Sequence, residues 1–513
     1  MLFNSYPFLF AFLPIALAGY FVIARISLRA AALWVGLASL FFYGWWNPKY
    51  VLLLLVSVAV NFVTGRAISH AREAAAEQRA RGLLVAGLIF DLGLLAFYKY
   101  ADFFVENANT LGAGLTPLHI VLPLGISFFT FTQIAFLVDA YRGIAKEYSA
   151  IHYLLFVTYF PHLIAGPVLH HKEMMPQFAD PACYRWDWQN CAVGLTIFAI
   201  GLAKKVLLAD EIAAYVAPVF DSGGKVAFFE AWGAALAYAL QLYFDFSGYS
   251  DMAIGLSRLF GVRLPLNFAS PYKAANIIEF WRRWHMTLSR FLRDYLYFPL
   301  GGNRRGPARR YVNLMTTMIL GGLWHGAGWT FVLWGTLHGL YLVLNHGWRE
   351  LVASPLRLSR SRAYRLAAGT LTFLAVVVAW VPFRAKSIDA AGHLLQAMSG
   401  LNGFVLPDRW LAAAPVLQEW GVRATDLGFA SFRVQFYVTA ALMAIALLAP
   451  NTQTLLRRFD PAVDFHSGGS GQASRLAWRP SAAWLAFIGL LLAWSVVRVP
   501  QGEQLSKFLY FQF

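Results

Sequence analysis

The stretch LGGLWHGAGWTFVLWG, residues 320–335, is apolar along its length except for one ionisable side chain, that of His325. Such a run belongs in lipid or in a tight core, where an ionisable group is costly and usually has a function. Imidazole is the side chain best suited to accept and return a proton near neutral pH. The flanking glycines would let a substrate approach the backbone closely. We expect a membrane-embedded general base here, with a packed structural histidine as the alternative.

Long apolar runs recur along the whole chain. Of the 513 residues, 59% are hydrophobic and 13% charged, and the mean hydropathy is +0.54. With its flanks, each run approaches the roughly 20 residues that cross about 30 Å of hydrocarbon. The runs cover residues 8–23, 31–46, 83–97, 192–203, 331–344, 366–382, 436–449 and 482–496. We expect an all-α, polytopic transmembrane bundle of about eleven helical segments. A single membrane-embedded domain should span residues 1–513.

The charge pattern favours a membrane protein over a nucleic-acid-binding one. The net charge is +16, but the basic residues cluster beside the apolar runs, as at 70–82 and 357–365, which is typical of the positive-inside rule. No nucleic-acid partner is expected. The first run lacks the basic start and the cleavage pattern of a signal peptide, so it should remain as a span. Cys183 and Cys191 form no C-x-x-C pair, and no metal site is expected.

The most basic segment is RRWHMTLSRFLRDYLYFPLGGNRRGPARR, residues 282–310, in which Asp294 is the one acidic residue. Interleaved arginines and aromatic residues are typical of a helix at the membrane interface. The alternative is a basic vestibule that attracts a phosphate-bearing cofactor through Arg282, Arg283 and Arg290. Arg290 and Asp294 are spaced to pair on a helix. Alternation of spans places this segment inside only if one earlier segment is re-entrant, and we expect that segment between residues 192 and 256.

Several polar residues stand among apolar ones and are candidates to support His325. In QLYFDFSGYSDMAIG, residues 241–255, two carboxylates are interspersed with aromatic and small residues. Intramembrane carboxylates usually face the bundle interior and pair there, so a structural network with nearby arginines and a direct role are both open. If the helix is continuous, His338 lies close to the face opposite His325, which makes it a weaker partner. The supporting candidates are Asp245, Asp251, Ser289, Trp324 and His338.

Two long motifs carry a family resemblance. FWRRWHMTLSRFLRDYLYFPLGGNRRG and MILGGLWHGAGWTFVLWGTLHGLYLV resemble the membrane-bound O-acyltransferase (MBOAT) superfamily, in its alginate O-acetylase branch of bacterial polysaccharide acetyltransferases. The resemblance runs from MLFNSYPFLFAFLPIAL at the start to FLYFQF at the end. It implies a helical bundle around a central funnel. It also implies that His325, in LWHG, and His285, in WRRWHMTLS, are the catalytic histidines.

The resemblance implies acetyl transfer across a bacterial inner membrane. A neutral imidazole would take the proton of an attacking hydroxyl and return it to the departing thiolate. The donor would be acetyl-CoA or another cytoplasmic acyl thioester, with no permanently bound cofactor. The acceptor would be an exported polysaccharide such as alginate, reached through a periplasmic esterase-like partner and the export machinery. Indole N–H groups of Trp324 or Trp329 would steady the oxyanion.

Three alternatives accompany this interpretation. A branch of the same superfamily transfers D-alanyl groups from a carrier protein, although the alginate-type opening and ending argue against it. A non-enzymatic transporter would also be polytopic, but no paired repeat of transporter type is visible. A scaffold of a polysaccharide export complex would need neither histidine. Residues 457–480, which include HSGGSGQAS, should form a flexible loop in solvent.

Overall fold

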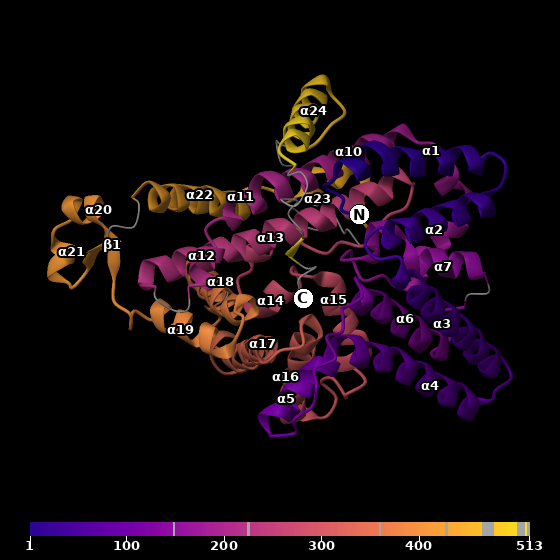
Figure 1. The fold of residues 1–513 in the computed structure, drawn as a ribbon, viewed down its shortest axis with the longest axis horizontal. Helices are drawn as coiled ribbons and strands as arrows, with labels where there is room; N and C mark the ends of the chain where they lie inside the picture. Colours follow the sequence, from indigo (N-terminus) through magenta and orange to yellow (C-terminus); the bar gives the residue numbers. More distant parts are fainter. Residues whose placement is uncertain are drawn as a thin grey trace. The chain divides into compact units, whose positions relative to one another are not determined.

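The computed structural model describes residues 1–146, 149–222, 226–358, 361–425, 429–463, 477–499 and 508–509. Helices dominate this part of the chain (Figure 1). Its only strands are β1, Val405–Pro407, and β2, Arg423–Thr425, which pair in parallel with Val405 opposite Arg423. The all-α class is therefore confirmed. Of the loop predicted at 457–480, residues 464–476 lie outside the described residues, and Arg457–Phe459 form a short 3₁₀ helix.

The chain divides into two compact units. The first comprises Met1–Ala203, Gly248–Asn267 and Thr452–Phe513, and the second comprises Lys204–Ser247 and Phe268–Asn451. The long helix α13, Phe228–Leu259, contributes residues to both. The single membrane-embedded domain expected over residues 1–513 stays a prediction.

Apolar helices build the first unit, and a few polar contacts join them. On α3, Asn61 donates its side-chain amide to Asp91 of α4 over 2.7 Å. The hydroxyl of Tyr159 lies 3.1 Å from that of Ser257 on α13. The principal helices are η1 (Pro7–Phe12), α1 (Leu13–Ala24), α2 (Leu28–Gly44), α3 (Lys49–Glu73), α4 (Glu77–Leu95), α5 (Ala101–Thr110), α6 (Ile126–Tyr141), α7 (Ala150–Thr158), α9 (His171–Ala179), α10 (Trp188–Ala203), α23 (Thr452–Leu455) and α24 (Ala482–Val497).

The second unit contains both candidate histidines. Helix α17 packs against both α16 and α18, and β1 packs beside α20. Its elements are η4 (Lys204–Ala209), α11 (Asp210–Ala213), α12 (Ala217–Phe220), α14 (Ile277–Trp281), α15 (Met286–Leu292), η6 (Arg293–Tyr297), α16 (Gly306–His325), α17 (Trp329–Trp348), α18 (Arg362–Arg384), α19 (Ile388–Met398), α20 (Asp408–Ala413), α21 (Val416–Glu419) and α22 (Phe429–Leu448).

Five helical stretches of the described chain are long and apolar enough to cross a membrane: Pro7–Ala24, Lys49–Glu73, Glu77–Thr110, Trp188–Ala213 and Arg362–Arg384. Shorter apolar helices cover Leu28–Gly44, Ile126–Tyr141, Phe432–Leu448 and Ala482–Val497. The protein is therefore a multi-pass membrane protein. The apolar runs identified in the sequence left out α3 and α6, because buried polar side chains such as Asn61 and Gln133 interrupt them. The number of crossings and the re-entrant segment stay predictions.

A break between α16 and α17 changes the interpretation of the opening stretch. Helix α16 ends at His325 and α17 begins at Trp329, so residues 320–335 form a helical hairpin and not one continuous helix. A Cβ on Gly322 would lie 2.2 Å from the Phe331 carbonyl oxygen, and one on Gly335 would lie 2.3 Å from that of Met318. These two glycines permit close packing of α16 on α17. For Gly322, which flanks His325, this packing leaves no room for the expected approach of a substrate to the backbone.

Candidate active site

The second unit brings the two predicted histidines together. His325 is the last residue of α16, and His285 lies between α14 and α15. Their imidazole centroids are 6.4 Å apart, and the ring planes meet at 57°. His285 is 1% exposed and His325 is 6% exposed. Two buried imidazoles at this separation can both face one small reacting group.

The backbone at His285 is held in an unusual conformation. Its φ of 43° and ψ of 54° lie in the left-handed region, which is costly for a residue with a Cβ. Such strain persists only where surrounding contacts fix it, and it concentrates at functional sites. The carbonyl of His285 accepts from the Ser289 N–H over 2.9 Å and so begins α15. The Ser289 hydroxyl donates to the Trp284 carbonyl over 3.3 Å.

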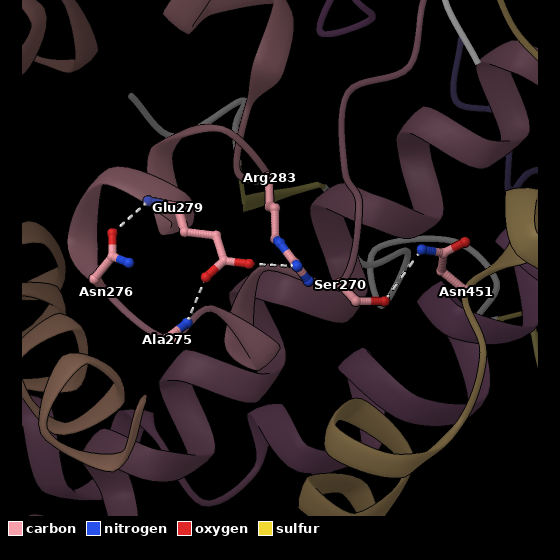
Figure 2. Close-up of polar contacts among 6 residues, drawn as sticks. All are labelled: Ser270, Ala275, Asn276, Glu279, Arg283 and Asn451. Atoms are coloured by element: carbon pink, nitrogen blue, oxygen red, sulfur yellow. Dashed lines mark hydrogen bonds and ion pairs between the residues drawn. The ribbon is translucent and has the colours of Figure 1, made fainter. Parts of the chain in front are cut away.

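Polar contacts fix the start of α14, the helix that leads to His285 (Figure 2). The Asn276 side chain accepts from the Glu279 N–H over 3.0 Å, which caps the helix. The Glu279 carboxylate accepts from the Ala275 N–H over 2.8 Å and from Arg283 over 2.5 Å. Arg283, a predicted phosphate ligand, is therefore already paired with Glu279 in an ion pair about one-third exposed.

Aromatic rings enclose the two histidines. The His325 ring centroid lies 4.9 Å from that of Trp324, 5.0 Å from that of Trp334 and 5.2 Å from that of Phe383 on α18. The His285 ring meets the edge of Phe246 at 4.8 Å. Aromatic walls exclude water, and electrostatic interactions become stronger where water is excluded. Trp329, the other predicted oxyanion donor, begins α17 with 57% of its surface exposed.

His338 belongs to the same aromatic cluster as His325. Its ring centroid is 4.8 Å from that of Trp334 and 5.1 Å from that of Trp281. Because Trp334 contacts both histidines, His338 and His325 are linked through one indole ring. The expectation that His338 points to the opposite face is wrong, since it assumed a continuous helix and the chain reverses between the two residues.

The two predicted carboxylates belong to different units. In the second unit, Asp245 lies 2.7 Å from the Lys205 ammonium, which is also 2.8 Å from Asp210. In the first unit, Asp251 accepts from Thr452 over 2.6 Å and from Gln453 over 2.7 Å. Both arrangements favour the structural interpretation. Sequence reasoning missed Lys205, although a lysine directly after the apolar run 192–203 was a signal for it.

The basic segment, residues 282–310, contains both paired and exposed arginines. Asp294 pairs with its neighbour Arg293 over 2.7 Å, and this hydrogen bond raises the pKa of Arg293. Arg282 is exposed, whereas Arg290 is half-buried. Three arginines that were not singled out as cofactor ligands are also exposed: Arg304, Arg305 and Arg309. A cluster of exposed guanidiniums attracts phosphate groups.

These features define a multi-pass helical membrane protein with a buried pair of histidines. The family model described as MBOAT, membrane-bound O-acyltransferase family, matches residues 84–378, which include both histidines. The chain belongs to this family and is an O-acyltransferase. The resemblance expected from its motifs is therefore confirmed.

Relatives with related activities match the chain at different lengths. It is 37% identical over the full length of both chains to a Pseudomonas aeruginosa protein named "Probable alginate O-acetylase AlgI". It is 44% identical to "Peptidoglycan O-acetyltransferase" of Helicobacter pylori, over 79% of this chain and 81% of the relative. It is 28% identical to "Teichoic acid D-alanyltransferase" of Streptococcus thermophilus, over 44% of this chain and 57% of the relative.

Proposed function

We propose that this O-acyltransferase moves an acetyl group from a cytoplasmic acyl thioester toward hydroxyls of an exported polysaccharide, with His325 as the general base. The observation that carries the proposal is the pair of buried imidazoles, His285 and His325, 6.4 Å apart within the aromatic wall. Two relatives named as O-acetylase or O-acetyltransferase support an acetyl group as the cargo.

The chemistry balances without a redox partner or metal. Neutral His325 takes the proton of the attacking hydroxyl while the oxygen of that hydroxyl bonds to the thioester carbonyl carbon. The tetrahedral intermediate then breaks its carbon–sulfur bond, and the imidazolium returns the proton to the thiolate. Carbonyl groups at the C-terminal end of α16 stabilise the transient positive charge on His325. General acid–base assistance of this kind contributes about 10² to 10⁴ in rate.

His285 acts beside the base as a second ring that contacts the reacting groups. Burial and the neighbouring Phe246 ring leave its imidazole little freedom to move away. A fixed neighbour holds the hydroxyl or the sulfur in line with His325, and such positioning accounts for much of the rate enhancement of an enzyme. His285 therefore matters for both binding and turnover.

The donor is acetyl-CoA or another acyl thioester, which arrives from the cytoplasmic side. CoA carries several phosphate charges, and guanidiniums bind phosphate strongly. The exposed arginines of the basic segment, Arg282, Arg304, Arg305 and Arg309, supply such charges. Arg283 is paired with Glu279 and contributes less. No cofactor remains bound between turnovers.

The acceptor lies beyond a bacterial inner membrane and is reached through a periplasmic esterase-like partner in a polysaccharide export complex. The full-length match to a protein named as an alginate O-acetylase supports alginate or a similar polymer. The higher identity to a protein named as a peptidoglycan O-acetyltransferase favours cell-wall glycan as the second candidate. The match to the D-alanyltransferase covers less than half of the chain, so D-alanyl transfer has weaker support.

One experiment separates these candidates. The wild-type chain, His325→Ala and His393→Ala are each expressed in a bacterium that lacks its own copy of the gene. His393 lies exposed on α19 and serves as the matched control. Ester-linked acetate released by mild alkali is measured in both exported polysaccharide and peptidoglycan, together with ester-linked D-alanine and the amount of each variant in the membrane.

The result identifies the acceptor and tests the base. We expect one glycan fraction to lose its acetate with His325→Ala and to keep it with His393→Ala, at equal membrane levels. If ester-linked D-alanine is lost instead, the transferred group is D-alanyl and not acetyl. Wild-type acetylation by His325→Ala would leave only a transporter or scaffold role.

A further inference from the structure

Three aromatic residues beside His325 form a compact cluster: Trp281 of α14 and Trp334 and His338 of α17. Their ring centroids are separated by 4.8 Å between Trp334 and His338, 5.1 Å between Trp281 and His338, and 5.8 Å between the two indoles. His338 is fully buried, and Trp334 is 1% exposed. We call this group the indole–imidazole cluster.

Every side-chain nitrogen of the indole–imidazole cluster lacks a hydrogen-bond partner among the described residues. This holds for Nε1 of Trp281, Nε1 of Trp334 and both ring nitrogens of His338. Two indoles elsewhere in this unit are paired, since Trp232 donates to the Met398 carbonyl and Trp348 to the Tyr364 hydroxyl, each over 2.9 Å. Buried polar groups in folded proteins are nearly always paired, so a cluster of unpaired buried nitrogens indicates that a polar ligand group, here called the guest, binds among them.

The chemistry of these nitrogens specifies what the guest must offer. An indole nitrogen can only donate, whereas a neutral imidazole donates from one nitrogen and accepts at the other. The cluster therefore provides at least three N–H donors against one acceptor. The faces of neighbouring rings accept N–H groups only weakly. An oxygen with two lone pairs, such as a carbonyl oxygen, matches this surplus of donors.

The cluster is also close to the proposed base. Trp334 meets His325 edge to face at a centroid distance of 5.0 Å, with ring planes at 84°. The same indole ring therefore contacts His325 and His338. A carbonyl group bound by the cluster would therefore be separated from the His325 imidazole, the proposed general base, by the Trp334 ring alone.

We propose that Trp281, Trp334 and His338 bind a carbonyl oxygen of the acyl thioester donor, an inference that rests on the proposed function. Two carbonyls of such a donor share this chemistry. One is the thioester carbonyl, whose oxygen becomes an oxyanion during transfer and gains most from preorganised N–H donors. The other is an amide carbonyl of the donor's pantetheine arm, which contributes only to binding.

The test uses the purified full-length protein and two donors. Acetyl-CoA carries amide carbonyls in its arm, whereas S-ethyl thioacetate carries only the thioester carbonyl. The acceptor is the glycan fraction that loses its acetate in cells with His325→Ala. Thiol release in the presence of this acceptor is followed for wild type, Trp334→Phe, Trp281→Phe and His338→Ala, with thermal midpoints measured in parallel. Phenylalanine keeps an aromatic ring and removes the N–H. Trp348→Phe, near the end of the same helix as Trp334, is the matched control.

The thioester carbonyl and the amide carbonyl give different kinetic outcomes, and each outcome supports carbonyl binding by the cluster. If the thioester carbonyl is the guest, kcat with both donors falls by about 10²-fold or more in Trp334→Phe or Trp281→Phe. If an amide carbonyl is the guest, KM for acetyl-CoA rises while S-ethyl thioacetate is used normally. Trp348→Phe is unchanged in both cases. Trp281→Phe, from another helix, keeps the test valid if Trp334→Phe fails to fold.

Two results would overturn the inference, and they are distinguishable. Normal kcat and KM for both donors in Trp334→Phe and Trp281→Phe, in a preparation where His325→Ala is inactive, would reduce the cluster to packing and leave the proposed function intact. A wild-type protein that releases thiol from neither donor in the presence of this acceptor would remove the proposed donor chemistry, and the carbonyl site with it.

Discussion

The imidazole rings of His285 and His325 lie 6.4 Å apart although they come from different segments, one before α15 and one at the end of α16. We therefore expect unequal losses when each is removed. His325→Ala should lower kcat by about 10² to 10⁴, the usual contribution of a general base. His285→Ala should lower kcat less and also raise KM, because it positions the reacting groups. Kinetics of the two variants check this order, and a larger kcat loss for His285→Ala would reverse the two roles.

The left-handed backbone of His285 predicts an inverted order of stability among small substitutions. In ordinary helical or extended backbone, glycine is less stable than alanine by roughly 0.5–1 kcal/mol. At φ 43° alanine keeps the steric penalty and glycine does not. His285→Gly should therefore melt at or above the temperature of His285→Ala. Thermal midpoints in detergent decide this, and a clearly lower midpoint for the glycine variant would contradict the assigned conformation.

Glycine packing between α16 and α17 predicts a sharp contrast between two alanine substitutions. Gly322→Ala places a methyl group 2.2 Å from the Phe331 carbonyl oxygen, a backbone atom that cannot move aside cheaply. It should destabilise the protein by about 1–3 kcal/mol, the usual cost of overpacking. Gly347→Ala, on α17, meets no atom within 4 Å and is the matched control. Equal unfolding profiles for the two variants would refute the close packing.

The polar pair in the first unit gives a double-mutant test. Asn61→Leu removes the amide that donates to Asp91 over 2.7 Å and should cost about 1–3 kcal/mol, because a buried carboxyl group loses its donor. Replacing Asp91 by leucine as well removes the unsatisfied group, so the double variant should be more stable than Asn61→Leu alone. A coupling energy near zero in this cycle would show that the contact contributes nothing.

The helical class and the two candidate catalytic histidines could be predicted from the sequence, but the backbone geometry around these histidines could not. Apolar runs predict membrane helices because burial depends on composition, and family motifs marked His285 and His325. The reversal between His325 and Trp329 was missed because an apolar, glycine-rich stretch fits a continuous helix as well as a hairpin. The sharing of Trp334 between His325 and His338 depends on that reversal, so the indole–imidazole cluster was invisible as well.

Lys205 provides the last prediction, because its ammonium is buried between two carboxylates, at 2.7 Å from Asp245 and 2.8 Å from Asp210. Removing one partner of a buried ionic group leaves uncompensated charge and typically costs about 3–5 kcal/mol. Lys205→Met should therefore strongly reduce the yield of folded protein. The triple variant Lys205→Met, Asp245→Asn, Asp210→Asn should recover much of that loss, since no unpaired charge remains. Monodispersity and the thermal midpoint measure the stability of the single and the triple variant. His325-dependent thiol release by the triple variant separates a structural network from a catalytic one. Retained activity means that Asp245 holds the helices together, whereas loss of activity in a well-folded triple variant would return Asp245 to the reaction.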